Sequence, residues 1–132
     1  MLSLEVDMVQ YDCPYIDTTA DYEITFFTKQ WDFDAAKQRL ETRIMAQGAT
    51  SEELDRGLDR LREHPNMHNV ELLRRKGEKA LFRSQIGETQ AMESIRGNNG
   101  YITGPFEIRD GSEMWRVGFD TESVAQGALS DL

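Results

Sequence analysis

Residues 70–86 read VELLRRKGEKALFRSQI, and they carry the clearest structural signal in the chain. Two strand-like segments, 70–74 and 80–86, flank the tripeptide Lys76-Gly77-Glu78. A glycine between two such segments is typical of a hairpin turn, because it tolerates the backbone angles that a tight turn needs. The pattern predicts an antiparallel hairpin, and the segments on either side of it indicate the fold.

Toward the N-terminus, the sequence predicts two strands separated by a loop. Residues 2–9 alternate apolar and polar side chains, the period of a half-buried strand. Residues 22–28 are rich in aromatic and β-branched side chains, which favour strands. Between them, Pro14 interrupts residues 11–19, and this segment is predicted to be a loop.

Two helices are predicted between residue 28 and the hairpin. Asp32 is the predicted N-cap of a helix that ends at Gly48. A second helix begins at Thr50 or Ser51 and ends near Glu63, since a proline follows shortly after. The apolar stripes of these helices consist of Phe33, Ala36, Leu40, Ile44 and Met45, and of Leu54, Leu58 and Leu61.

After the hairpin, short elements alternate with turns. The sequence predicts, in order, a helix over 89–95, a turn at 98–100, a broken edge strand over 101–108, a strand over 114–119 and a last helix from Thr121.

The predicted order of elements defines the fold class. From residue 22 the order is βαββαβ when the helix pair is counted as one helix. This is the order of a ferredoxin-like sandwich, which has helices on one face of an antiparallel sheet. Extra N- and C-terminal strands would extend this sheet. We therefore expect an α+β fold in which residues 1–132 form a single domain.

Charge narrows the range of functions. The formal net charge is −9, whereas binding to nucleic acid or to an anionic membrane needs a basic face. The N-terminal segment is acidic and lacks the apolar run of a signal peptide, and no apolar stretch is long enough for a membrane span. We expect a cytoplasmic protein that does not itself bind nucleic acid or membranes.

The basic residues are biased toward arginine, with four Lys against eleven Arg. An acidic surface that is poor in Lys suits a cytoplasm with about 1 M salt, where charges are screened within a few Å. The composition favours a halophilic protein over an ordinary acidic one.

Three residues are candidates for a redox or metal site. Cys13 is the only cysteine, and nearby acidic residues would raise rather than lower the pKa of its thiol, so burial explains it better than redox chemistry. His64 and His68 are four residues apart, but Pro65 breaks the helix between them. The two histidines and Cys13 form a candidate zinc or haem site, while contact with the carbonyls at a helix end is the simpler explanation for the histidines.

Catalytic signatures are missing from the sequence. The carboxylates are spread along solvated faces, and no Ser/His/Asp or Cys/His arrangement has a supporting motif. We therefore expect no enzymatic activity, and the sequence identifies no cofactor.

Three segments carry a resemblance to a known family. They are LEVDMVQYDCPYIDTT (residues 4–19), HPNMH (64–68) and GYITGPF (100–106). Together they resemble the N-terminal domain of haloarchaeal helix-turn-helix regulators of the bacterio-opsin-activator type, some of which are labelled dimethyl-sulfoxide-reductase regulators. The resemblance covers essentially the whole chain.

The resemblance implies a transcription regulator whose N-terminal domain senses a signal. DNA would be bound by a C-terminal helix-turn-helix domain that this chain lacks, and the domain would form a homodimer and respond to a small-molecule effector. A dimerisation module without a ligand, and a redox or metal sensor that uses Cys13 with His64 or His68, are the alternatives.

Overall fold

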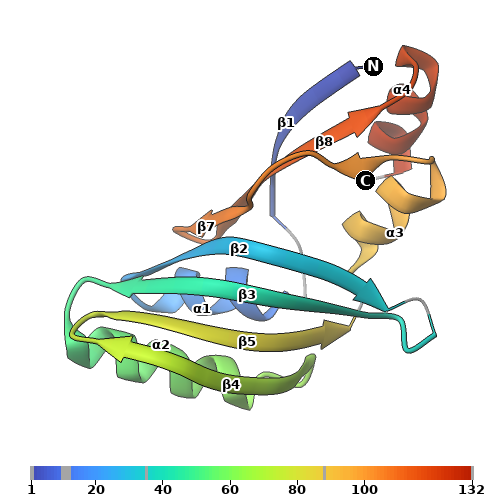
Figure 1. Cartoon of the computed structure of the whole chain (residues 1–132). Helices are drawn as coiled ribbons and strands as arrows, with labels where there is room; N and C mark the ends of the chain where they lie inside the picture. Colours follow the sequence, from blue (N-terminus) through green and yellow to red (C-terminus); the bar gives the residue numbers. More distant parts are fainter. Residues whose placement is uncertain (1, 10–12, 35, 88, 132) are drawn as a thin grey trace.

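The structure is a computed structural model of the whole chain, and it describes residues 2–9, 13–34, 36–87 and 89–131. These residues contain four helices and eight strands (Figure 1). Their bounds are β1 Leu2–Met8, α1 Pro14–Asp21, β2 Ile24–Asp34, β3 Arg39–Gly48, α2 Ser51–Glu63, β4 Met67–Lys76, β5 Lys79–Gly87, α3 Gln90–Gly97, β6 Tyr101–Ile102, β7 Glu107–Arg109, β8 Ser112–Phe119 and α4 Glu122–Asp131.

All eight strands belong to one sheet, and every pair of neighbours is antiparallel. The strand order is β1-β8-β7-β2-β3-β5-β4, and β6 pairs with β8 beside this path. The predicted α+β class with an antiparallel sheet is thus confirmed, and the architecture is consistent with a ferredoxin-like sandwich. The N-terminal strand β1 and the C-terminal strand β8 pair with each other and widen the sheet on one side.

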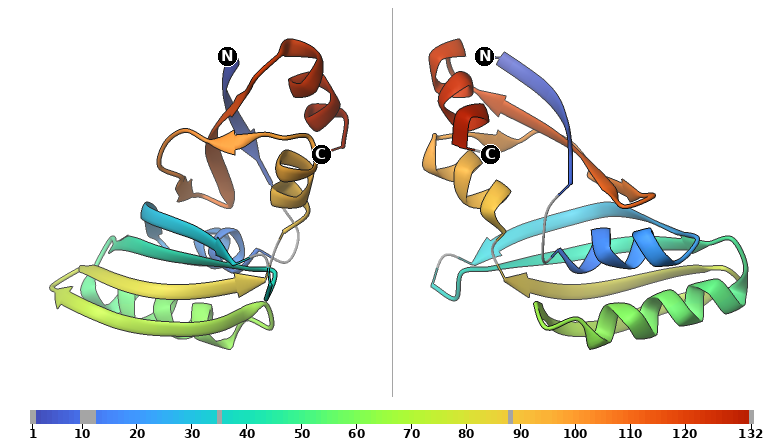
Figure 2. Two further views of the ribbon diagram at one scale, coloured as in Figure 1. Left: turned by 45° about the vertical axis from the view of Figure 1, so that its right-hand side comes forward. Right: turned by 180° about the vertical axis from the view of Figure 1, so that it is seen from behind.

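The helices lie in two groups. In the views of Figures 1 and 2, α1 and α2 run side by side across one face of the β2-β3-β5-β4 part, while α3 and α4 lie near β8. Leu54, Leu58 and Leu61 of α2 are buried against the sheet, as the helical stripe predicted. The buried apolar side chains form one core that includes residues of all four helices.

The hairpin of residues 70–86 is confirmed as β4 and β5, with Gly77 in the turn at a φ of 57°. The predicted start of α2 is also confirmed, because the Oγ1 of Thr50 accepts a hydrogen bond from the backbone N–H of Glu53. Thr89 caps α3 in the same way through the N–H of Met92.

The predicted helix from Asp32 to Gly48 is wrong. These residues form the second half of β2, a turn and β3. Leu40 and Ile44 are four residues apart, a spacing that fits both a helix and a strand, and the alternating burial of β3 shows that period two applies. The Oδ1 of Asp34 accepts hydrogen bonds from the N–H groups of Ala36 and Lys37, so an aspartate two residues after the predicted cap stabilises a turn instead.

The predicted loop over residues 11–19 is also wrong where the structure describes it. Residues 14–21 form α1, and Tyr11 and Asp12 lie outside the described residues. Pro14 occupies the first helical position, where its missing N–H has no helical partner to lose. The proline therefore begins a helix at a place where the sequence was interpreted as a break.

One close approach between β3 and α2 gives a first test of this packing. A Cβ atom on Gly48 would lie 2.7 Å from the backbone N of Leu54 and 2.7 Å from the backbone O of Thr50. We expect Gly48→Ala to lower the free energy of unfolding by about 2 kcal/mol or more, because backbone atoms cannot move aside as a side chain can. Chemical unfolding in concentrated KCl measures the effect.

Gly97→Ala is the matched control, because a Cβ on Gly97, the last residue of α3, meets no atom within 4 Å. That variant should be neutral or more stable by about 0.5–1 kcal/mol, the usual effect of replacing a helical glycine. Equal stability of the two variants would contradict the packing described for Gly48.

Candidate functional site

The described residues enclose a small cavity where the two groups of helices meet the sheet. It lies between the first turns of α1 and α3 and the inner sides of β3, β5, β7 and β8, and its volume is about 20 Å³. This is enough room for one water molecule, which needs about 10–15 Å³. The lining residues are Cys13, Tyr15, Leu40, Thr42, Ile86, Gly87, Thr89, Met92, Phe106, Ile108, Glu113 and Trp115.

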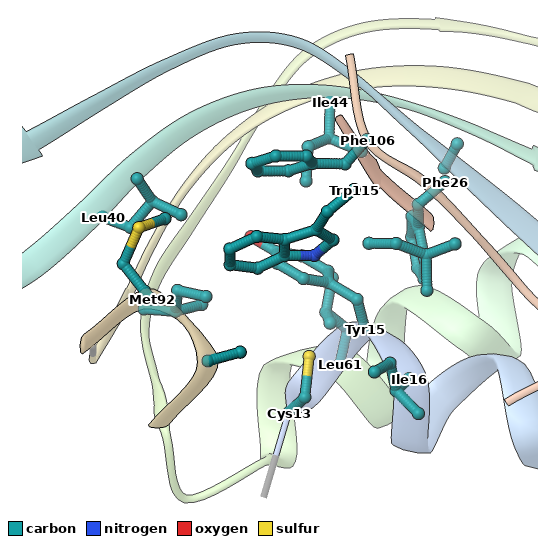
Figure 3. Close-up of a cluster of buried hydrophobic side chains, with 14 of the residues drawn as sticks. Cys13, Tyr15, Ile16, Phe26, Leu40, Ile44, Leu61, Met92, Phe106 and Trp115 are labelled. Carbon is teal, nitrogen blue, oxygen red and sulfur yellow. The ribbon is translucent and has the colours of Figure 1, made fainter. Parts of the chain in front are cut away.

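A stack of three aromatic rings reaches this cavity through two of its members. Phe106 lies between Trp31 and Trp115, with ring centroids 5.6 Å and 4.7 Å apart and interplanar angles of 25° and 15°. Figure 3 shows the Phe106 ring lying flat over the Trp115 indole. Trp31 is half-buried and is not a lining residue, so the stack runs from the surface to the cavity.

Three hydroxyl groups form a closed ring at the cavity. The Tyr15 hydroxyl is 2.6 Å from Ser84 Oγ and 3.1 Å from Thr42 Oγ1, and the latter two atoms are 2.9 Å apart. All three side chains are buried. The ring attaches α1 to the centre of the sheet, since the three residues come from α1, β3 and β5.

Burial raises the pKa of the Tyr15 phenol above its ordinary value, although the two hydroxyl hydrogen bonds partly offset the effect. The phenol therefore stays protonated and remains a hydrogen-bond donor within the ring.

Strand β8 places a carboxyl group and an indole on the inner side of the sheet. Glu113 and Trp115 are two residues apart and both are buried, so their side chains share one face of the strand. The Nε1 of Trp115 is buried and has no hydrogen-bond partner in the structure. A buried glutamate and an unpaired indole N–H beside a cavity are the polar features of this site that the sequence did not predict.

Cys13 is buried at the N-terminus of α1, with 2% of its surface exposed. The predicted burial is thus confirmed. Desolvation raises the pKa of the thiol, and the nearby charges of Glu113 and Asp17 raise it further, the former more. The thiol stays protonated near neutral pH, so it is a poor nucleophile and a poor redox group.

His64 makes a structural contact at the end of α2. Its Nδ1 accepts a hydrogen bond from the N–H of Asn66 at 3.1 Å, and its Nε2 is 2.7 Å from Oδ2 of Asp17 on α1. Because Nδ1 accepts, the hydrogen of the neutral ring lies on Nε2 and is donated to Asp17. Both ring nitrogens are occupied, and the histidine joins the end of α2 to α1.

His68 lies apart from this contact, exposed on the edge strand β4. Among residues 2–9, 13–34, 36–87 and 89–131, no group of three or more His, Cys, Asp or Glu side chains is placed to hold a metal ion. The geometry therefore does not favour a metal or haem site built from Cys13, His64 and His68.

The fold and the cavity define a class of protein: an α+β domain with a small, mainly apolar cavity between helix N-termini and sheet. The chain belongs to the family described as HVO_2525_N, N-terminal, whose model matches residues 3–132, and this indicates a haloarchaeal protein domain. No curated protein and no solved structure matches the chain. Within the part of the chain that the structure describes, no helix is long and apolar enough to cross a membrane.

The hydroxyl ring gives a second test. Tyr15→Phe removes one hydroxyl and leaves Thr42 and Ser84 with one partner fewer in a buried place. We expect a loss of about 1–2 kcal/mol in the free energy of unfolding. The control is Tyr101→Phe, whose side chain is 39% exposed and which should change stability by less than about 0.5 kcal/mol. If Tyr15→Phe were as stable as its control, the ring would not contribute.

The buried thiol of Cys13 gives a third test of the structure. A maleimide reagent should leave Cys13 unmodified in the folded chain at pH 8 and should modify it fully in guanidinium chloride, because the folded state both shields the thiol and raises its pKa. Mass spectrometry of the two samples measures the result. Rapid modification of the folded chain would show that the thiol is exposed and reactive.

Proposed function

We propose that this chain is the signal-sensing domain of a haloarchaeal transcription regulator. The observation that carries the proposal is the cavity lined by Cys13, Glu113 and Trp115, which lies where elements from both ends of the chain converge. A ligand at such a position would contact both groups of helices at once. The family match to an N-terminal domain and the resemblance to helix-turn-helix regulators support the same role.

A route from the cavity to the C-terminal helix is available. Met92 lines the cavity from the first turn of α3, and two residues further the Oγ of Ser94 donates a hydrogen bond of 2.8 Å to the carbonyl of Ala128 on α4. Displacement of α3 by a ligand would therefore move or strain this hydrogen bond to α4. A ligand that favours one arrangement of these helices would shift the regulator between states by its difference in affinity.

DNA binding is assigned to a helix-turn-helix domain elsewhere in the regulator. The net charge of −9 makes this domain a poor partner for phosphates. We assign it no catalytic activity and place the regulator in the cytoplasm, in line with its composition and its acidic N-terminal segment.

The test is thermal unfolding of the chain in concentrated KCl against a panel of small neutral molecules, amino acids, metals and redox reagents. A ligand at about 100 times its dissociation constant should stabilise the fold by roughly 2.7 kcal/mol. Such a shift, saturating with ligand concentration, supports the sensing role. The absence of any saturable shift across the panel would contradict it.

A ligand-free dimerisation module is the second candidate, and one surface favours it. Phe27, Met45 and Leu81 lie in register across β2, β3 and β5. They are half-buried on the face opposite α1 and α2, which no described helix covers (Figure 2). Stability that rises with protein concentration and ignores every ligand would favour this module over a sensor.

A redox or metal sensor receives less support. Cys13 is buried and protonated, both nitrogens of His64 are occupied, and His68 is exposed on another element. The panel of metals and redox reagents tests this alternative in the same experiment.

A further inference from the structure

We propose that the cavity binds one small uncharged molecule that carries a hydrogen-bond acceptor, and that the Nε1–H of Trp115 is the donor that holds it. This inference rests on the proposed sensing function and names the class of ligand for it.

The indole N–H provides the first argument. Among the described residues, Trp115 Nε1 and Thr28 Oγ1 are the buried side-chain polar atoms without a hydrogen-bond partner. Leaving a buried donor unpaired is costly, so nearly all such groups have a partner, either a protein group or an ordered water. Trp115 lines the cavity and Thr28 does not, so an acceptor within the cavity would offset this cost for the indole.

The charges around the cavity argue that the ligand is uncharged. Glu113 lines the cavity and is 4% exposed, and its negative charge raises the pKa of the Cys13 thiol, so an anion in the cavity would be repelled. Cys13 and Thr89 are the N-caps of α1 and α3, and the positive ends of these helix dipoles disfavour a cation. Leu40, Ile86 and Ile108 complete the wall, and burying a charge among apolar side chains is costly.

The size of the cavity limits the ligand to a few heavy atoms. The present volume of about 20 Å³ holds one water, which would occupy the site in the free protein. Met92 is the side chain best able to yield, because it is unbranched and has three rotatable bonds. Its movement would admit a molecule of the size of formamide or acetamide and would begin the displacement of α3.

The two tryptophans make a direct experiment possible. The chain has two indole N–H groups, and in ¹⁵N-tryptophan-labelled protein each gives one NMR signal. Trp31→Phe and Trp115→Phe assign them. Trp31 is an internal control, because it stacks on the same Phe106 ring yet does not line the cavity.

Titration with formamide and acetamide in concentrated KCl should move the Trp115 signal along a saturating curve and leave the Trp31 signal in place. Trp115→Phe keeps an aromatic ring and loses the donor. By thermal shift, this variant should bind the probe about five- to tenfold more weakly, which corresponds to about 1–1.4 kcal/mol for the lost hydrogen bond. Trp31→Phe should bind it with unchanged affinity.

Several outcomes overturn the proposal. If the Trp115 indole N–H contacts water and neither amide moves its signal, the cavity holds a structural water only. A shift with pressurised xenon but with neither amide would mean an apolar cavity without the proposed hydrogen bond. If another molecule of the panel stabilises the chain without moving the Trp115 signal, the sensing function stands and this site is overturned. Since the signal is read in the unmutated protein, poor folding of Trp115→Phe would not affect these conclusions.

Discussion

The position of β3 at the centre of the sheet is the constraint on which the rest of the structure depends. Residues Arg39–Gln47 pair with β5 along nearly the whole strand, and β3 pairs with β2 over a similar length on its other side. Its inward side chains, Leu40, Thr42, Ile44 and Ala46, are buried by α1, α2 and the cavity wall. A helix over the same residues would bury a similar stripe, but it would leave β2 and β5 without their common neighbour. The long-range pairing therefore overrides the local helical pattern.

Polar groups inside the core fix how the helices meet this sheet. The hydroxyl of Tyr15 is bonded to Thr42 and Ser84, while His64 joins the end of α2 to Asp17 on α1. Apolar contacts alone tolerate small shifts of a helix along a sheet, whereas these hydrogen bonds weaken once their distances and angles leave a narrow range. The polar contacts therefore give α1 a defined position, and with it the N-terminus of α1 where Cys13 meets the cavity.

The sequence contained most of the fold and little of the site. Segments with one unambiguous signal were predicted well, such as the Gly77 hairpin and the Thr50 cap of α2. Segments whose signal fits two structures were not: Leu40 and Ile44 suit a helix and a strand equally, and Pro14 both breaks and begins helices.

The cavity joins residues from Cys13 to Trp115, and no local pattern reports contacts across such separations. One signal was nevertheless present, because Glu113 stands at an inward position of a strand whose neighbours Trp115, Val117 and Phe119 are all core residues.

That buried glutamate also bears on how a signal could be transmitted. A carboxyl group in a core is tolerated when nearby dipoles compensate it, and here the first turns of α1 and α3 both face the cavity that Glu113 lines. The electrostatic interactions between this carboxyl group and the helix N-termini depend strongly on distance and on what fills the space between them. A molecule entering the cavity would alter those interactions for α1 and α3 together. Because Ser94 links α3 to Ala128 of α4, the response would not stay local but would reach the C-terminal helix. A surface used only for dimerisation would not require a cavity beside a buried carboxyl group, and this feature favours the proposed sensing role over the dimerisation module.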